Sequence, residues 1–180
     1  MVECKHTYPP RDQVSDTNTS PYWAGYHVQG YIHPSWLTAS PAPRIGMDTL
    51  PNSPYVAVAR DAARVSGIDV GIFLRMINQE SGFRPDAVSS AGAVGIAQLM
   101  PETTAGLGVN PRDPTSSLYA AARLLSGHLR NYGGDYAKAL ASYNAGADTV
   151  NQAVSRCTTR WRVCLPDETQ RYLHAILQDA

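Results

Sequence analysis

The chain has 180 residues, of which 43% are hydrophobic and 17% are charged, and its formal net charge at pH 7 is zero. This length suits one domain, and the globular composition excludes a disordered tail and a coiled coil. A neutral chain lacks the basic surface of a nucleic-acid binder, so we expect no nucleic-acid partner. There is no run of about 18 apolar residues, which predicts no transmembrane segment. The start has no signal-peptide pattern, so we expect either that export uses another route or that the signal peptide has already been removed.

The amino-terminal segment, residues 1–46, is rich in proline, serine and threonine. Six prolines in this range prevent long helices, which predicts an extended arm that ends near Met47. Apolar and polar residues alternate over 22–28, so a short strand or hairpin against the main body is one interpretation and a disordered leader is the other. The spacing of Cys4 and the nearby histidines matches no usual zinc pattern, so we expect no metal there.

Helical signals replace this pattern from Ser53 onward, so residues 47–180 are predicted to form one mainly α-helical domain. Capping residues, prolines and glycines divide it into helices. In chain order the helices begin after Ser53, after Asp69, at Pro101, after Asp113, after Asp135 and near Pro166; the first ends at Gly67, the second near Glu80 and Ser81, and the fourth at Gly133 and Gly134.

Two cysteines, Cys157 and Cys164, enclose six residues near the carboxyl-terminal end. A span of this length can close a hairpin-like loop, so a disulfide formed in an oxidising compartment is one interpretation. Two ordinary thiols in a loop are the other.

The sequence contains no HExxH, no Gly-rich phosphate loop and no GxSxG, so we expect neither metal, nucleotide nor acyl-enzyme chemistry, and no cofactor. Glu80 is instead predicted at the apolar end of a helix, before small residues and Gln98 that resemble a cleft wall. Burial there would raise the pKa of the carboxyl and keep it protonated as a general acid. Ordinary glycosidases use two carboxyl groups. Asp86 looks like a solvated turn residue, and no other acid stands close to Glu80 in an equivalent setting. A single-acid mechanism in which the substrate supplies its own nucleophile would account for this.

Four motifs occur in a fixed order: ES at 80–81, GAVGIAQLMP at 92–101, ASYNAG at 141–146, and PDET at 166–169 followed by Tyr172. Together they resemble the soluble lytic transglycosylase family, the lysozyme-like SLT domain, over roughly residues 54–177. The resemblance implies a mainly α, lysozyme-like fold for residues 47–180.

The resemblance also implies cleavage of the β-1,4 bond between N-acetylmuramic acid and N-acetylglucosamine in peptidoglycan without water, giving a 1,6-anhydro product. Glu80 would protonate the glycosidic oxygen and then deprotonate the muramoyl 6-hydroxyl, assisted by the 2-acetamido group. The expected partner is therefore the peptidoglycan glycan strand. We expect a monomer that acts outside the cytoplasm, whether secreted, periplasmic or phage-associated.

The same resemblance implies roles for other residues: Ser89 near the N-acetyl group, Gln98 and Met100 along the sugar subsites, Tyr143 and Asn144 positioning Glu80 and the sugar, and Glu168 and Tyr172 closing the cleft. The residues alone allow other interpretations. Ser89 would cap a helix beginning near Ala91. Tyr143 and Met100 would be core residues. Glu168 would interact favourably with the dipole at the amino-terminal end of its helix.

Two features depart from the family pattern. Ala97 stands where many relatives carry Met or Trp, which predicts a different subsite shape. The segment 151–164, with arginines at 156, 160 and 162, is longer and more basic than expected, so it either contacts peptide stems or is an inserted, solvated loop. Two rival functions stay open: a muramidase or chitinase that uses water, and a non-catalytic wall-binding or virion module.

Overall fold

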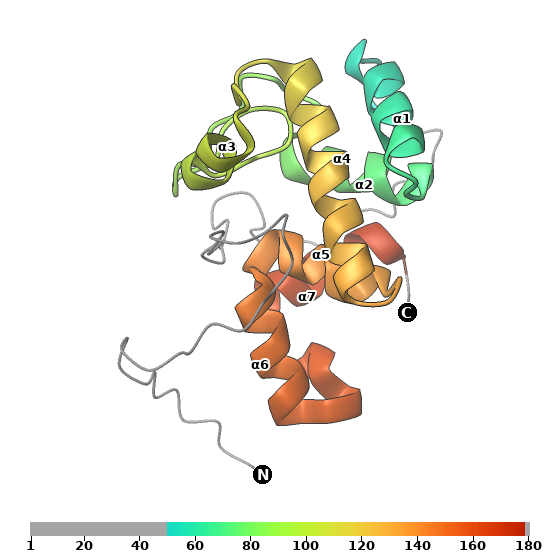
Figure 1. The fold of residues 1–180 in the computed structure, drawn as a ribbon, viewed down its shortest axis with the longest axis vertical. Helices are drawn as coiled ribbons and strands as arrows, with labels where there is room; N and C mark the ends of the chain where they lie inside the picture. The colour runs from blue at the N-terminus through green and yellow to red at the C-terminus, as the bar shows by residue number, and fades with distance from the viewer. Residues whose placement is uncertain (1–49, 179–180) are drawn as a thin grey trace.

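The structure is a computed structural model that describes residues 50–178. The predicted arm of residues 1–46, with its proposed strand and Cys4, lies outside the described residues. The helices are α1 (Tyr55–Val65), α2 (Val70–Ser81), α3 (Pro101–Leu107), α4 (Pro114–Asn131), α5 (Tyr136–Ala145), α6 (Ala147–Cys157), the 3-10 segment η2 (Thr158–Cys164) and α7 (Asp167–Leu177) (Figure 1). Within 50–178 the only β pairing is two isolated bridges of Val94, to Val88 and Leu99. The predicted mainly α fold is therefore confirmed for these residues.

Three of the predicted helix starts carry side-chain caps. Asp69, Asp113 and Asp135 each accept a hydrogen bond from a backbone N–H in the first turn of α2, α4 and α5, at 2.7, 3.1 and 3.1 Å. Such a cap satisfies a donor that the helix itself leaves unpaired. At its other end α2 stops at Ser81, because Gly82 takes a left-handed conformation with φ 61°. Glu80 consequently lies in the last turn of α2.

The segment 151–164, for which an inserted loop was one of two interpretations, lies in α6 and η2. After α5, Gly146 turns the chain with φ 84°, and α6 begins at the next residue. Val150 and Ala153 are the buried residues of α6, and Val154 packs partly buried against the same core. These positions follow helical spacing, so the sequence carries a signal for α6 that the prediction did not include.

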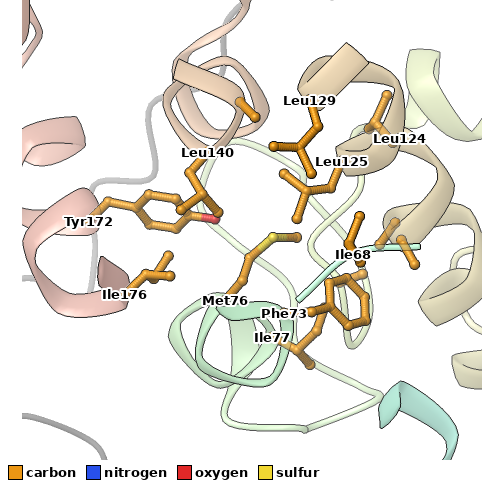
Figure 2. Close-up of a cluster of buried hydrophobic side chains, with 14 of the residues drawn as sticks. Ile68, Phe73, Met76, Ile77, Leu124, Leu125, Leu129, Leu140, Tyr172 and Ile176 are labelled. Carbon is orange, nitrogen blue, oxygen red and sulfur yellow. The ribbon is translucent and has the colours of Figure 1, made fainter. Parts of the chain in front are cut away.

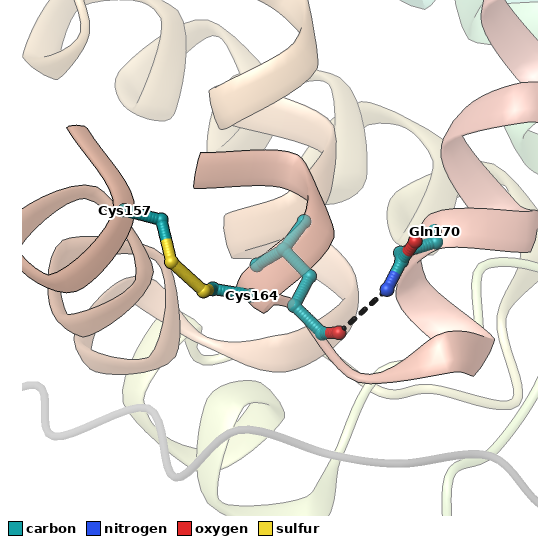
Figure 3. The surroundings of a disulfide bond; sticks show 4 residues. Cys157, Cys164 and Gln170 are labelled. Carbon is teal, nitrogen blue, oxygen red and sulfur yellow. Dashed lines mark hydrogen bonds between the residues drawn. A yellow bond between two sulfur atoms is a disulfide. The ribbon is translucent and has the colours of Figure 1, made fainter. Parts of the chain in front are cut away.

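The two cysteines at the ends of η2 are joined in a disulfide, with their Cα atoms 6.4 Å apart (Figure 3). The chain between Cys157 and Cys164 is a 3-10 segment and not the hairpin-like loop that was expected. Its Trp161 is buried in the hydrophobic core. Beyond it, the side-chain amide of Gln170 donates to the carbonyl of Leu165 at 2.9 Å, which fastens the return into α7.

The hydrophobic core lies around α2. Figure 2 shows side chains from α2, α4, α5 and α7 meeting in one cluster. Burial of this apolar surface stabilises the packing of α2 against α1 and α7, and of α5 against α4, α6 and α7. None of the described helices has the length and apolar character needed to cross a bilayer. The central members of the core are Phe73, Met76, Ile77, Leu125, Leu140 and Ile176.

Candidate active site

Glu80 is buried at the carboxyl end of α2, with 7% of its surface exposed. Loss of solvent raises the pKa of its carboxyl group from 4.5 to about 8, the direction that its predicted place at an apolar helix end implies. The charge of Glu168 raises this pKa further, and a hydrogen bond from Tyr172 lowers it. Glu80 is therefore protonated at neutral pH and able to donate a proton.

Tyr172 binds Glu80 directly. Its hydroxyl donates a 2.6 Å hydrogen bond to Glu80 Oε1, across 92 positions of sequence. The resemblance had assigned Tyr172 to closing the cleft, but the side chain is only 3% exposed and its hydroxyl is used on the acid. The difference arises because position 172 lies on the inner side of α7, one turn from Thr169 and facing the end of α2.

The segment between α2 and α3 folds back over the end of α2. Ser81 Oγ donates to the carbonyl of Ile96 at 2.6 Å. Further along, Ser89 Oγ accepts from the N–H of Ala93 at 2.9 Å, and the Ser89 N–H donates to the Ala93 carbonyl. The alternative in which Ser89 caps a helix starting near Ala91 is therefore wrong, because the hydroxyl closes a turn.

Gln98 ties this segment together from its other side. It adopts φ 47°, and its amide Nε2 donates to the carbonyls of Gly95 and Ala87 at 2.8 and 3.2 Å. The side-chain amide is thus occupied by the loop backbone, and Gln98 is buried. Met100 follows as the residue that precedes α3, and it is partly exposed.

Tyr143 reaches the same segment from α5. Its hydroxyl donates to the carbonyl of Ala97 at 2.9 Å and not to Glu80. Burial, together with the nearby charge of Glu80, raises the pKa of Tyr143 well above its ordinary value, so it stays a neutral donor. Tyr143 therefore lies close to the acid and supports the loop beside it.

Asn144 and Thr169 form a buried pair that the sequence analysis did not identify. Thr169 Oγ1 donates to Asn144 Oδ1 at 2.8 Å, joining α5 to α7. The threonine is 1% exposed and the asparagine 9%. With Oδ1 occupied, the amide nitrogen of Asn144 is the group left to act as a donor. The available signal was the threonine of the PDET motif, three residues before Tyr172.

Glu168 supplies a second acid near Glu80, contrary to the expectation that none is close. It is 9% exposed, and its charge acts on the pKa of Glu80. Packing of α7 against α2 brings these two residues together although 88 positions separate them. The closer acid in sequence, Asp86, is exposed as expected. Within 50–178 no group of three or more His, Cys, Asp and Glu side chains is placed to hold a metal ion.

The site thus consists of a protonated carboxyl group, a tyrosine that donates to it, and a loop rich in backbone carbonyls and small residues. A buried neutral acid can protonate a leaving oxygen, and the hydrogen bond from Tyr172 stabilises the carboxylate that remains. The arrangement favours general acid and base catalysis at one carboxyl group.

Comparison with known proteins agrees with this chemistry. The sequence matches the family described as "Transglycosylase SLT domain" over residues 57–160, more than half of the chain. It is 39% identical over 85 residues to a transglycosylase of Enterobacteria phage PRD1, covering 47% of this chain and 32% of that protein. It is 32% identical over 111 residues to membrane-bound lytic murein transglycosylase D of Escherichia coli strain K12, covering 54% of this chain and 25% of the relative. The chain thus spans a third or less of these relatives.

A solved structure extends the likeness to the fold. An inactive glutamate-to-glutamine mutant of the lytic transglycosylase Slt from Pseudomonas aeruginosa superposes with a TM-score of 0.62 at 28% identity. The superposition covers 72% of this chain and 23% of that one. The lysozyme-like, mainly α fold expected from the sequence is thereby confirmed for the described residues.

Proposed function

The chain belongs to the transglycosylase SLT domain family, and from this premise we propose that residues 47–180 cleave the β-1,4 bond between N-acetylmuramic acid and N-acetylglucosamine in peptidoglycan. The bond is broken without water, and the muramoyl product carries a 1,6-anhydro ring. One observation carries the proposal: Glu80 is a buried carboxyl group with a pKa of about 8 and a tyrosine hydroxyl on its Oε1.

The reaction has two proton transfers at Glu80. In the first, the neutral carboxyl group protonates the glycosidic oxygen, and the N-acetylglucosamine leaves with a free 4-hydroxyl. The substrate's 2-acetamido group stabilises the resulting oxocarbenium-like carbon. In the second, the Glu80 carboxylate takes the proton of the muramoyl 6-hydroxyl while that oxygen bonds to the anomeric carbon. Glu80 is then protonated again and ready for another cycle.

The neighbouring residues support these steps from fixed positions. Tyr172 donates to the carboxylate between the two transfers, when the negative charge is present. Tyr143 and Gln98 hold the loop carbonyls of Ala97 and Gly95. We assign Asn144 to the substrate as an amide donor. The sugar contacts are assigned to Ser89, Gln98, Met100, Asn144 and Glu168.

A water-using hydrolase is the second candidate, favoured by one observation. Glu168 is a buried carboxyl group near Glu80, and hydrolases use such a second group as base or nucleophile. The change Glu168→Gln separates the two functions. A hydrolase would lose turnover, whereas the single-acid enzyme would keep its product and show a lower pKa for Glu80.

One relative is named as a membrane-bound lytic murein transglycosylase and another as a phage transglycosylase, and both names support a site of action outside the cytoplasm. We propose that the wall-facing compartment is also where the Cys157–Cys164 disulfide forms.

The test is digestion of purified peptidoglycan sacculi, with the released muropeptides identified by mass spectrometry. We expect 1,6-anhydro ends from the wild-type chain and none from Glu80→Gln. Asp86→Asn is the matched control, because it removes an exposed carboxyl group six residues away and is expected to release the same products. Reducing ends would establish the hydrolase, and release by Glu80→Gln at the wild-type rate would refute the role of Glu80. The relative solved as an inactive glutamate-to-glutamine mutant supports this choice of substitution.

A further inference from the structure

Arg75 links the middle of α2 to the end of α7. Its Nε donates a 2.5 Å hydrogen bond to the carbonyl of Ile176, across 101 positions of sequence. Arg75 takes no part in the proposed chemistry, but it lies on the same helix as Glu80. We propose that Arg75 is a positioning residue for the reaction: by holding α7 on α2, it keeps Tyr172 against Glu80 and solvent away from that carboxyl group. The proposal rests on the proposed function only for the role of Glu80 as the acid.

The carbonyl that Arg75 binds is one that α7 cannot satisfy by itself. The last four carbonyls of a helix have no partner within it, and Ile176 is the next-to-last residue of α7. The carbonyl of His174, in the same turn, accepts from the backbone N–H of Gln178. The guanidinium group also lies where the helix dipole is negative, which favours a cation. This end of α7 is therefore satisfied by a side chain from α2.

A hydrogen bond at each of two places joins α2 and α7. Tyr172 donates to Glu80 at 2.6 Å, and Arg75 donates to Ile176. The order of the paired residues is reversed between the helices, so the helices run in opposite directions. The two pairs are about 7.5 Å apart along α2 and about 6 Å apart along α7. Figure 2 shows Tyr172 and Ile176 reaching from α7 toward Met76, the residue after Arg75. One bond alone would let α7 pivot, whereas two bonds fix both its position and its direction.

Arg75 acts on Glu80 through α7 and not through its own charge. The influences on the pKa of Glu80 are loss of solvent, the hydrogen bond from Tyr172 and the charge of Glu168. Tyr172 and Glu168 both belong to α7. Tyr143 of α5 also lies near the acid, and burial keeps it neutral by raising its pKa. The placement of α7 therefore determines the surroundings in which Glu80 ionises.

Loosening of α7 changes the pKa of Glu80 in two opposite directions. Entry of solvent lowers this pKa, and loss of the hydrogen bond from Tyr172 raises it. Loss of solvent is the largest of the influences, so the net change is downward. Removal of a hydrogen bond from a charged donor favours local opening by roughly tenfold. Because the opened form ionises near pH 4.5, a chain without this donor should show a pKa of Glu80 lower by roughly one pH unit.

The test measures the pKa of Glu80 in the full chain by NMR, from the pH dependence of its carboxyl carbon. The chain contains four glutamates, so labelling of this residue type gives a simple spectrum. Arg75→Met keeps the aliphatic stem and the helix propensity but removes the donor, and should lower the pKa by roughly one pH unit. Arg75→Lys keeps a cationic donor and should restore the wild-type pKa. If Arg75→Met does not fold, Arg75→Ala takes its place with the same expected decrease.

Ser126→Ala is the matched control. Ser126 Oγ on α4 donates at 2.9 Å to the carbonyl of Ser66, the residue that follows α1, so this change also removes a side-chain donor from a carbonyl at a helix end. It should lower the melting temperature and leave the pKa of Glu80 in place. Tyr172→Phe gives the opposite sign, because it removes the hydrogen bond but keeps the burial.

Three results would overturn the proposal. The pKa of Glu80 would keep its wild-type value or rise in Arg75→Met, Arg75→Lys would behave as Arg75→Met does, or Ser126→Ala would lower the pKa equally, which would make the change a general loss of stability. The titration needs no substrate, so its outcome is independent of the digestion test. In an active chain the alkaline limb of kcat/KM should move to lower pH together with the pKa. A lowered pKa in a chain that releases no anhydro ends would fail the proposed function alone.

Discussion

The hydroxyl of Tyr172 on α7 donates a 2.6 Å hydrogen bond to Oε1 of Glu80 at the end of α2. Tyr172 is 3% exposed, and burial with the nearby charge of Glu80 raises its own pKa well above the ordinary value. It therefore remains a neutral donor whether Glu80 is protonated or ionised. This hydrogen bond stabilises Glu80 most when its carboxyl group is ionised, because hydrogen bonds to charged groups are stronger than those between neutral groups.

Tyr172→Phe is expected to move the alkaline limb of the rate profile to higher pH. The lost hydrogen bond is the interaction that lowers the pKa of Glu80, so the pKa should rise above about 8. The rate at neutral pH should fall roughly tenfold or more, because the carboxylate between the two proton transfers loses its donor. The measurement is kcat/KM against pH on a soluble glycan. Tyr143→Phe is the control and should leave the limb in place, since its hydroxyl bonds Ala97.

Glu80→Gln is expected to stabilise the fold above neutral pH. Between pH 4.5 and about 8 the folded chain holds a proton that the unfolded chain has released, so wild-type stability falls as pH rises. Glutamine keeps an oxygen that accepts the hydrogen bond from Tyr172. It has no titrating carboxyl group, so this fall of stability with rising pH disappears. The free energy of unfolding should exceed that of the wild type by about 2–4 kcal/mol at pH 7.5 and match it near pH 4. Urea unfolding at both pH values checks this, and equal curves at pH 7.5 would contradict it.

His128 is expected to destabilise the fold in acid. Burial lowers its pKa from 6.5 to about 4, and its Nε2 has no hydrogen-bond partner in the described part of the chain. Below pH 6.5 the imidazole of His128 binds a proton in the unfolded chain but stays neutral in the folded chain, so stability falls as pH decreases. His128→Gln should remove about 3 kcal/mol of this loss by pH 4. Urea unfolding at pH 4 and pH 7 measures the difference, and equal pH dependence of the wild type and His128→Gln would contradict it.

Thr169→Val is expected to weaken substrate binding through Asn144. Valine keeps the shape and removes the hydroxyl that holds Asn144 Oδ1, so the amide is no longer oriented. We expect KM to rise several-fold and stability to fall by about 1–3 kcal/mol. Thr169→Ser keeps the hydroxyl and should restore KM. If KM rose and stability fell equally in both variants, the hydroxyl would have no positioning role.

Reduction of the Cys157–Cys164 disulfide is expected to lower the melting temperature. A closed loop of this length stabilises a fold by about 2–3 kcal/mol through restriction of the unfolded chain. Differential scanning calorimetry with and without a thiol measures the change. The double variant Cys157→Ser with Cys164→Ser should melt at the same temperature as the reduced wild type, and adding the thiol should not change that temperature. A reduced wild type that melts as the oxidised one does would contradict this expectation.

Local chemistry made much of the fold predictable. Asp69 and Gly82 mark the two ends of α2 through a side-chain cap and a left-handed glycine, and both depend on a few adjacent residues. The same local pattern placed Glu80 at an apolar helix end and gave the direction of its pKa. The helix α6 was missed although Val150, Ala153 and Val154 follow helical spacing, so this part of the fold was predictable from local pattern too.

The contacts within the site could not be predicted in the same way. The pairing of Glu80 with Tyr172 and its proximity to Glu168 depend on how α7 packs against α2, and no local periodicity records that packing. Motif order indicated that these residues belong to one site. It could not tell which tyrosine donates to the acid, and the structure assigns that bond to Tyr172 and the loop carbonyl to Tyr143.

The docking of α7 has a consequence for when the chain acquires its acid. Apart from tertiary structure, Glu80 is an ordinary carboxyl group that ionises near pH 4.5 and cannot donate at neutral pH. It holds its proton at neutral pH once tertiary packing, to which α7, the last helix described, contributes, removes solvent from the end of α2. A chain still being synthesised, before this packing has formed, is therefore expected to hold Glu80 as an ionised carboxylate at neutral pH.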